Sequence, residues 1–197
     1  MTLGEPLQVT KQIADVFQDL KILYMVGGSL ASSLHGIPRA TQDIDIIADI
    51  KPNNVKELVN ILKKDFYIDE DMIKEALSRC TSFNIIHLET MFKVDIFILK
   101  QDQVAKEEMS RRKSYKISEK QNLYLTSAED IIIHKLHWYE LGNRVSERQW
   151  TDVIGVLQVQ GKRLNYDYLK KTANQMNVSE LLTQAIEEVE KKISEDY

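Results

Sequence analysis

The sequence is poor in the features that mark secreted and membrane-spanning proteins. Its single cysteine, Cys80, excludes a disulfide within the chain and suits a reducing compartment. No apolar run approaches the roughly 20 residues that a bilayer-spanning helix needs. The first residues contain no basic stretch followed by an apolar stretch, so no signal peptide is expected. These absences predict a cytoplasmic protein without a membrane partner.

The chain also lacks a strong charge of one sign, internal repeats and low-complexity segments. Its formal net charge is −4 over 197 residues, so the whole chain does not have the basicity of a typical nucleic-acid binder. The three cations at residues 111–113 are either a solvated surface or a local patch for the phosphates of a nucleic acid. The length suits one large domain, or a catalytic half and a helical half without a long linker between them.

Residues 24–49 organise the chain, because their pattern predicts a strand, a glycine turn, a short helix and a second strand. In the turn, Gly27 and Gly28 let the backbone bend sharply and approach a ligand without a Cβ in the way. Ser29 follows at the expected helix start, where it can cap the helix and where free N–H groups attract an anion such as a triphosphate. The turn is therefore a candidate phosphate-binding site.

The second strand of this stretch carries two aspartates. Asp43 and Asp45 are two residues apart, so both side chains leave the strand by the same face. Ile44 and Ile46 leave by the other face, toward a core. Two close carboxylates repel each other unless a cation lies between them. Mg²⁺ is the natural cation, because it prefers oxygen ligands and is usually shared between carboxylates and substrate phosphates.

A further aspartate lies inside an apolar strand. The runs over residues 83–88 and 92–99 predict a hairpin, and the second run carries Asp95 on the face opposite Val94 and Ile96. An isolated carboxylate is costly to bury without a partner. Asp95 is therefore either a functional group or an aspartate at the strand edge that reaches water.

The order Gly28-Ser29, a gap of thirteen residues and the sequence DIDI from Asp43 resembles the signature of the DNA polymerase β nucleotidyltransferase superfamily. The resemblance implies an α+β fold, with a mixed sheet and flanking helices, followed by a C-terminal helical region. It also implies that Asp95 is a third carboxylate on an adjacent strand and that Asp43, Asp45 and Asp95 bind Mg²⁺. Without the resemblance, the pattern is a turn followed by a strand with two solvent-facing acids.

The rest of the chain reads as mostly helical. Apolar spacing predicts an amphipathic helix over residues 6–20, which packs on the sheet. From residue 126 the chain turns helical, and Ser127 with Asp130 resembles a capping box. Later helices are expected at about residues 146–158, 165–176 and 179–194. The expected organisation is a nucleotidyltransferase catalytic domain over residues 1–120 and a helical region over residues 121–197 packed on it.

The helical region resembles the C-terminal part of AbiEii-type nucleotidyltransferases and their bacterial relatives. That group has a Ser-x-Glu-Asp helix start, a Lys-Leu pair, an Arg-rich turn and then an aspartate on the next helix. Together with the glycine turn and the DIDI strand, the resemblance covers about residues 20–180. The matching positions of the helical region are Ser127, Glu129, Asp130, Lys135, Leu136, Arg144, Arg148 and Asp152.

The AbiEii resemblance implies that Lys135 lies near the nucleotide phosphates, for which a compact ammonium is suited, and that Asp152 lies beside it. Asp152 then either orients Lys135 or assists in activating the acceptor. The plainer alternatives are a surface lysine, or one whose stem covers apolar surface, and an Asp152 paired with Arg148 on its own helix. Arg39 either reaches a nucleotide phosphate or is a loop cation near Asp43.

These residues predict a Mg²⁺-dependent nucleotidyltransferase that moves an NMP from an NTP, such as ATP, to an acceptor hydroxyl. By resemblance to the AbiEii-like toxins, tRNA is an expected acceptor and an antitoxin an expected partner. A small molecule or a protein hydroxyl is the enzymatic alternative. A nucleotide-binding protein without turnover is the alternative of a different class, although mere binding has no need of three mutually repelling acids.

Overall fold

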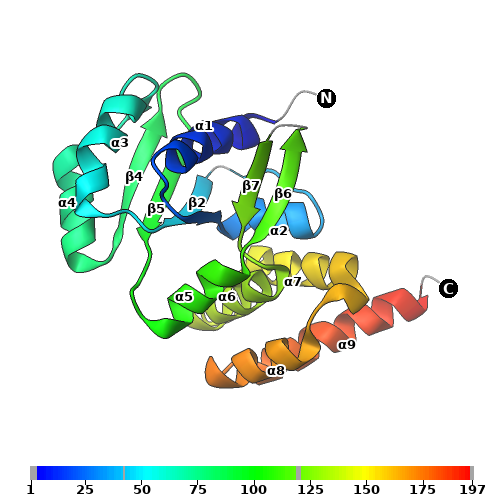
Figure 1. Cartoon of the computed structure of the whole chain (residues 1–197). Helices are drawn as coiled ribbons and strands as arrows, with labels where there is room; N and C mark the ends of the chain where they lie inside the picture. The colour runs from blue at the N-terminus through cyan, green and yellow to red at the C-terminus, as the bar shows by residue number, and fades with distance from the viewer. Residues whose placement is uncertain (1–3, 42, 119–120, 196–197) are drawn as a thin grey trace. The chain divides into compact units, whose positions relative to one another are not determined.

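The computed structural model describes residues 4–41, 43–118 and 121–195, and the chain divides into two compact units. The first unit comprises Met1–Leu30 and Ala40–Thr126, and the second comprises Ala31–Arg39 and Ser127–Tyr197 (Figure 1). The sequence places one boundary at residue 120. The units instead divide after Thr126, because the strand that precedes it belongs to the sheet, and residues 31–39 join the helical unit.

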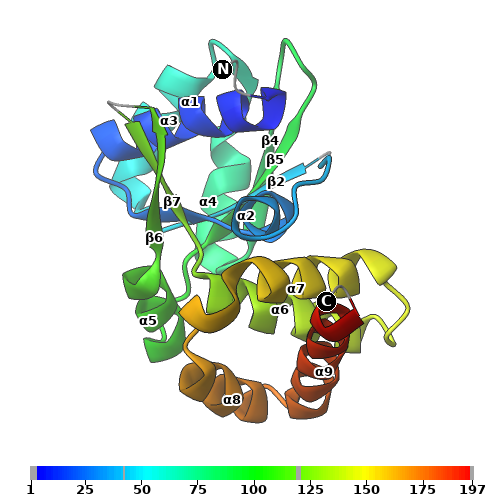
Figure 2. The same ribbon diagram turned by 90° about the vertical axis from the view of Figure 1, so that its right-hand side faces the viewer.

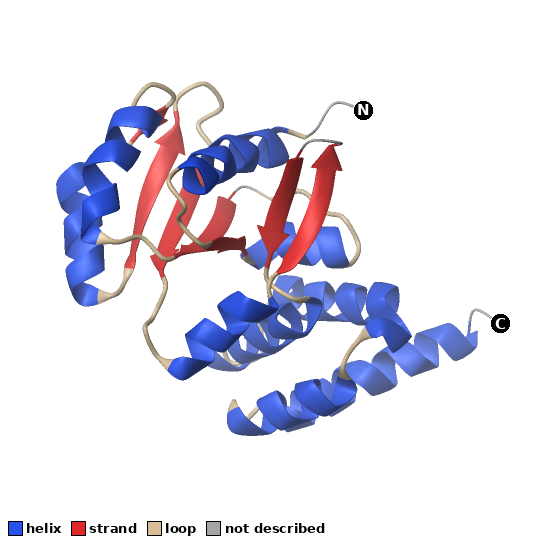
Figure 3. Ribbon diagram, in the orientation of Figure 1, coloured by secondary structure: helices blue, strands red, loops and turns tan. Residues whose placement is uncertain are grey.

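Seven strands of the described residues form one mixed sheet in the first unit (Figure 3). Their order across the sheet is β3-β4-β5-β2-β1-β7-β6. β2 pairs with β5, and β1 with β7, in parallel, while the other pairs are antiparallel. The strands are β1 (Tyr24–Val26), β2 (Asp43–Ala48), β3 (Phe66–Tyr67), β4 (Ser82–His87), β5 (Lys93–Ile98), β6 (Lys113–Ser118) and β7 (Gln121–Leu125).

The two central strands alternate between an apolar and a polar face, as their sequences predict. Ile44 and Ile46 of β2 are fully buried, and so are Val94 and Ile96 of β5. β4 and β5 form the antiparallel hairpin expected from the sequence. The buried side chains hold these strands in one register, because a shift of one residue would carry the whole apolar set to the other face.

Four helices of the first unit pack against the sheet or against one another: α1 (Glu5–Asp19), α3 (Val55–Leu62, after the 3₁₀ turn Pro52–Asn54), α4 (Glu70–Arg79) and α5 (Gln103–Arg111). α1 contacts β2 and α3, and α4 contacts α3 and β4. Met109 of α5 packs with Met25, and Ile47 joins the same cluster. Ile47 shares a face of β2 with Asp43 and Asp45, so that face is apolar at one end and acidic at the other.

The second unit is a helical bundle with its own core (Figure 2). Its helices are the later part of α2 (Gly28–His35), α6 (Ala128–Leu141), α7 (Glu147–Gln160), the 3₁₀ turn Gly161–Arg163, α8 (Tyr166–Gln175) and α9 (Ser179–Glu195). The hydroxyl of Ser127 accepts the N–H of Asp130 at 3.1 Å, which confirms the predicted cap of α6. Within the described part of the chain, no helix combines the length and the apolar character that crossing a membrane requires.

Candidate functional site

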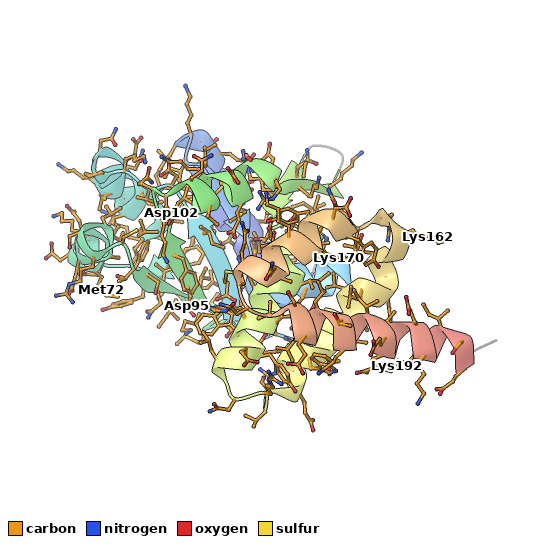
Figure 4. All side chains as sticks on the ribbon, turned by 90° about the horizontal axis from the view of Figure 1, so that it is seen from below. Met72, Asp95, Asp102, Lys162, Lys170 and Lys192 are labelled. Atoms are coloured by element: carbon orange, nitrogen blue, oxygen red, sulfur yellow. The ribbon has the colours of Figure 1, made fainter. Side chains whose placement is uncertain are left out.

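The sheet gathers three aspartates on one of its faces. In the parallel pair β2–β5, Asp45 lies directly beside Asp95, and Asp43 lies beside Lys93. On the other side of β5, Asn84 of β4 lies opposite Asp95. Asp43, Asp45 and Asp95 all leave the sheet on the side away from the buried isoleucines, and we call these three residues the carboxylate face. Figure 4 labels Asp95 among the side chains of its unit.

The glycine turn lies against the carboxylate face. The N–H of Gly27 donates to the backbone oxygen of Asp45 at 2.8 Å. Gly28 has φ +54°, and a Cβ added to it would lie 1.7 Å from Oδ2 of Asp45. Only glycine fits this position, because the backbone is left-handed and a carboxylate oxygen occupies the space of a side chain. α2 begins at Gly28, so Ser29 lies in its first turn rather than at the cap expected from the sequence.

A lysine lies at the carboxylate face. Nζ of Lys93 is 2.7 Å from Oδ2 of Asp95. The hydrogen bond with Asp95 is the largest cause that raises the pKa of Lys93 above its ordinary value, the charges of Asp95, Asp43 and Asp45 add to it, and burial opposes them. Lys93 therefore stays protonated and neutralises part of the negative charge of this face. The sequence KVD indicates that these two side chains are close, since alternation along a strand places Lys93 and Asp95 on the same side.

The donor chemistry of the carboxylate face fits Mg²⁺. Carboxylate oxygens are its preferred protein ligands, and a helix start, such as that of the adjacent α2, favours anions such as the phosphates with which Mg²⁺ is usually shared. Among the described residues, no group of three or more His, Cys, Asp or Glu side chains is arranged to hold a metal ion as it stands. The three residues that would hold the ion are thus on one face, and one of them is engaged by Lys93.

The second unit contains a buried ion cluster formed by Ser32, Arg39, Lys135 and Asp152. Nε and Nη2 of Arg39 donate to the two carboxylate oxygens of Asp152 at 2.6 and 2.8 Å. Nζ of Lys135 lies 2.9 Å from Oδ2 of Asp152, which also accepts the hydroxyl of Ser32 at 3.1 Å. The side chains of Lys135 and Asp152 are only 7% and 4% exposed. The cluster holds two cations around one anion.

The surroundings of Asp152 favour its charged form. Burial alone would raise the pKa of this carboxyl, but the hydrogen bonds and charges of Arg39 and Lys135 outweigh burial and hold the pKa below its ordinary value. Asp152 is therefore ionised at neutral pH, and its oxygens are engaged by Arg39, Lys135 and Ser32. The arrangement suits a group that positions two cations.

A cavity of about 270 Å³ opens between α4 and the start of β4 in the first unit. Its lining includes Met72, which Figure 4 labels, and the charged side chains of Glu75 and Arg79. Asn84 is also part of the lining, and Asn84 is the register partner of Asp95. The cavity therefore reaches the strand next to the carboxylate face.

No family model and no curated protein matches the sequence. Solved structures do match. A nucleotidyltransferase-like protein from Paracoccidioides brasiliensis superposes with a TM-score of 0.55 at 16% identity, over 93% of this chain and 92% of its own. The chain has the nucleotidyltransferase fold.

Two antibiotic-modifying enzymes share this nucleotidyltransferase fold. The lincosamide adenylyltransferase LnuA, bound to lincomycin, matches with a TM-score of 0.52 at 12% identity, over 80% of this chain and 98% of its own. The resistance factor ANT(2'')-Ia, in complex with adenylyl-2''-tobramycin, matches with a TM-score of 0.55 at 13% identity, over 87% and 97%. At such identities the likeness establishes the architecture, which confirms the α+β fold expected from the sequence.

The nucleotidyltransferase fold brings the expected site residues together in two groups. In the first unit, the glycine turn adjoins Asp45, and Asp95 is its neighbour in register. In the second unit, Arg39, Lys135 and Asp152 form the buried ion cluster. Lys135 is thus buried rather than a surface lysine, and Asp152 pairs across the unit rather than with Arg148. Lys93 and Ser32 are not among the residues expected from the sequence, nor is the pairing of Arg39 with Asp152.

Proposed function

We propose that this chain is a Mg²⁺-dependent nucleotidyltransferase that moves an NMP from an NTP to an acceptor hydroxyl. The observation that carries the proposal is the contact of Gly28 with the carboxylate of Asp45, with Asp95 beside Asp45 in register. A turn that exposes backbone N–H groups to phosphates then adjoins oxygen ligands for the accompanying ion. The match to nucleotidyltransferase structures over most of the chain supports the same chemistry.

Each of the six candidate site residues of the first unit has a role in the proposed reaction. Asp43, Asp45 and Asp95 hold the Mg²⁺, and Gly27, Gly28 and Ser29 bind the β- and γ-phosphates. Bound Mg²⁺ supplies charge neutralisation at the attacking and leaving oxygens. Asp95 takes the proton of the acceptor hydroxyl while that oxygen bonds to the α-phosphorus. The bond from the α-phosphorus to the bridging oxygen breaks, and pyrophosphate leaves.

For the second unit, the proposal follows the AbiEii resemblance. Lys135 and Arg39 supply positive charge for phosphate groups, and Asp152 is a positioning residue that orients both cations. The bidentate geometry supports this role for Asp152, because two parallel hydrogen bonds fix the plane of the guanidinium of Arg39.

We extend the proposal to a small-molecule acceptor. The chain has a net charge of −4, which does not favour a polyanionic acceptor. Two of the matching structures are antibiotic-modifying proteins whose own lengths this chain spans almost completely. The tRNA acceptor and the antitoxin partner implied by the AbiEii resemblance, and a protein acceptor, are the competing outcomes of the experiment.

The experiment measures transfer of label from each α-labelled NTP, with Mg²⁺ and with EDTA. Acceptors are the small-molecule fraction of a lysate, its protein fraction and total tRNA. Asp45→Asn and Asp95→Asn are expected to lower transfer by about 100-fold or more. Asp49→Asn is the matched control, because the side chains of Asp49 and Asp95 are both 21% exposed and both are paired with a lysine. Full transfer by Asp45→Asn would contradict the proposal.

A binding protein without turnover gives a different result. It transfers no label to any fraction, while an NTP still raises its thermal stability in proportion to binding. Label in the small-molecule fraction supports the proposed acceptor, whereas label only in tRNA or only in protein contradicts that part of the proposal. The four NTPs, compared under the same conditions, identify the preferred base.

A further inference from the structure

Lys93 differs from other surface lysines in what surrounds it. Its ammonium lies 2.7 Å from Oδ2 of Asp95, and its backbone is the register partner of Asp43 on β2. Asp45, in turn, is the register partner of Asp95. One cation therefore lies at a face that carries three negative charges.

A second lysine in the same unit shows what an ordinary pair looks like. Lys51 lies 2.6 Å from Asp49, again two residues away, and the side-chain exposures of this pair, 49% and 21%, match the 50% and 21% of Lys93 and Asp95. Asp49 follows β2, and Lys51 precedes the turn Pro52–Asn54. The two pairs are alike in spacing and exposure, but Lys93 adjoins the carboxylate face, whereas Asp49 also accepts a hydrogen bond from Nε2 of Gln101 at 3.1 Å.

A divalent ion at the carboxylate face competes with this ammonium. The divalent ion and the ammonium of Lys93 both bind the carboxylate of Asp95, and like charges a few ångströms apart repel strongly. An ion that uses Asp95 as a ligand must therefore move the ammonium away, and the four-carbon stem of Lys93 lets it leave toward solvent.

We propose that Lys93 is a built-in counter-cation of the carboxylate face, which engages Asp95 in the metal-free chain and which a divalent ion must displace. It holds the three carboxylates together without a metal and sets how tightly the metal binds. This inference rests on the proposed function, because it takes Asp43, Asp45 and Asp95 as the ligands of the ion. It assigns a role to a residue outside that ligand set.

The test measures Mn²⁺ binding to the full chain without nucleotide, from the electron paramagnetic resonance signal of free Mn²⁺. Lys93→Met is expected to bind Mn²⁺ about tenfold more tightly than the wild type, because one adjacent positive charge is removed. Lys51→Met, the matched control, is expected to bind as the wild type does. Asp45→Asn is expected to lose the binding and so identifies the site that is measured.

A second readout separates a counter-cation from a merely structural side chain. In EDTA, Lys93→Met is expected to melt at a lower temperature than the wild type, because three carboxylates then face one another without a cation. Mn²⁺ is expected to raise the melting temperature of Lys93→Met more than that of the wild type. If Lys93 were merely structural, Lys93→Met would melt lower than the wild type by the same amount in EDTA and in Mn²⁺, and its Mn²⁺ affinity would be unchanged.

The outcomes distinguish this inference from the proposed function. Unchanged Mn²⁺ affinity in Lys93→Met, with binding still lost in Asp45→Asn, overturns the role of Lys93 and leaves the metal site in place. Saturable Mn²⁺ binding that Asp45→Asn does not affect, or no binding by either the wild type or Lys93→Met, overturns the metal site and the proposed function with it. Tighter binding by Lys93→Met but not by Lys51→Met supports both.

Discussion

Asp152 and Asp95 are both paired with a lysine, yet their different burial means that removing a charge from each pair has a different effect. The side chain of Asp152 is 4% exposed and holds two cations, whereas that of Asp95 is 21% exposed and holds Lys93. Loss of a buried anion leaves its partners charged and unpaired, which is costly. Loss of a partly exposed charge is largely compensated by water, so its cost in stability is smaller and its effect on ligand binding weighs more.

Substitution of Asp152 by Asn is therefore expected to destabilise the chain by about 3 kcal/mol or more at neutral pH. The pKa of Asp152 is lowered by folding, so its contribution is fully present above the ordinary aspartate pKa of about 4. That contribution is lost as the pH falls through the lower pKa of the folded state. Urea unfolding of both proteins at neutral pH and near pH 3.5 measures the difference, which is expected to shrink in acid.

Asp71→Asn is the control for this measurement. The side chain of Asp71 is 92% exposed and lies 3.4 Å from Lys74. Its substitution is expected to change the free energy of unfolding by less than about 0.5 kcal/mol at either pH. A cost for Asp152→Asn that is the same at both pH values would contradict an ionised Asp152 at the centre of the buried ion cluster.

At the scale of elements, the start of α2 shows how a local conformation places a helix terminus beside the carboxylate face. The positive φ of Gly28 turns the chain from β1 into α2 within two residues, and it brings the first turn of the helix against Asp45. The helix terminus and the carboxylate face are adjacent because no side chain separates them. In the proposed function, this position couples the phosphate-binding turn to the ligands of Mg²⁺.

Gly28→Ala is expected to destabilise the chain and to abolish the rise in melting temperature that ATP and Mg²⁺ produce. A left-handed backbone costs an alanine about 1–2 kcal/mol, and the clash with Asp45 adds to that cost. Gly161→Ala is the control for a positive φ without a clash, because Gly161 has φ +48° with ψ −124° and no atom within 4 Å of an added Cβ. It is expected to show only the backbone cost and the full nucleotide effect. Equal behaviour of the two variants would contradict the contact as the cause.

The helices and strands with strong apolar periodicity could be predicted from the sequence, and the polar ones could not. The α1 helix, the β4–β5 hairpin and the helices of the second unit lie close to their expected positions. The α5 helix and the β6 strand, in the polar stretch over residues 103–118, were missed, and so was the short strand β7, although its Leu123 and Leu125 are buried. Met109 is the only fully buried apolar side chain of α5, and β6 lies at the sheet edge. Elements that bury little apolar surface leave little periodic signal.

Some features of the candidate site could be predicted from local sequence, whereas others depend on contacts between residues far apart in the chain. The face shared by Asp43 and Asp45, and the glycine turn before them, follow from strand and turn geometry alone. The partner of Arg39 does not, since Asp152 is 113 residues away and only the folded second unit brings them together. Alternation along β5 predicts that Lys93 shares a face with Asp95. Its place beside Asp43 follows only from the register of β5 against β2.

At the scale of the whole molecule, the charge of the carboxylate face predicts that ATP binds together with Mg²⁺ rather than alone. The carboxylate face carries three negative charges against the one positive charge of Lys93, so it repels a bare triphosphate. ATP with EDTA is therefore expected to raise the melting temperature of the chain little. ATP with Mg²⁺ is expected to raise it by more than the two separate effects combined. A rise from ATP that is as large in EDTA would contradict nucleotide binding at the carboxylate face.

The proposed small-molecule acceptor also predicts how the proposed transfer reaction responds to salt. A protein that makes 6–10 phosphate contacts with a nucleic acid loses about 10³–10⁵-fold in affinity between about 50 and 200 mM salt. With a small-molecule acceptor, the transfer rate at subsaturating acceptor is expected to change less than about threefold over that range. The effect of salt on nucleotide binding is measured separately, as the rise in melting temperature from ATP and Mg²⁺ at both salt concentrations, and the transfer rates are corrected for it. A fall of about 100-fold or more that remains after this correction would contradict a small-molecule acceptor and favour RNA.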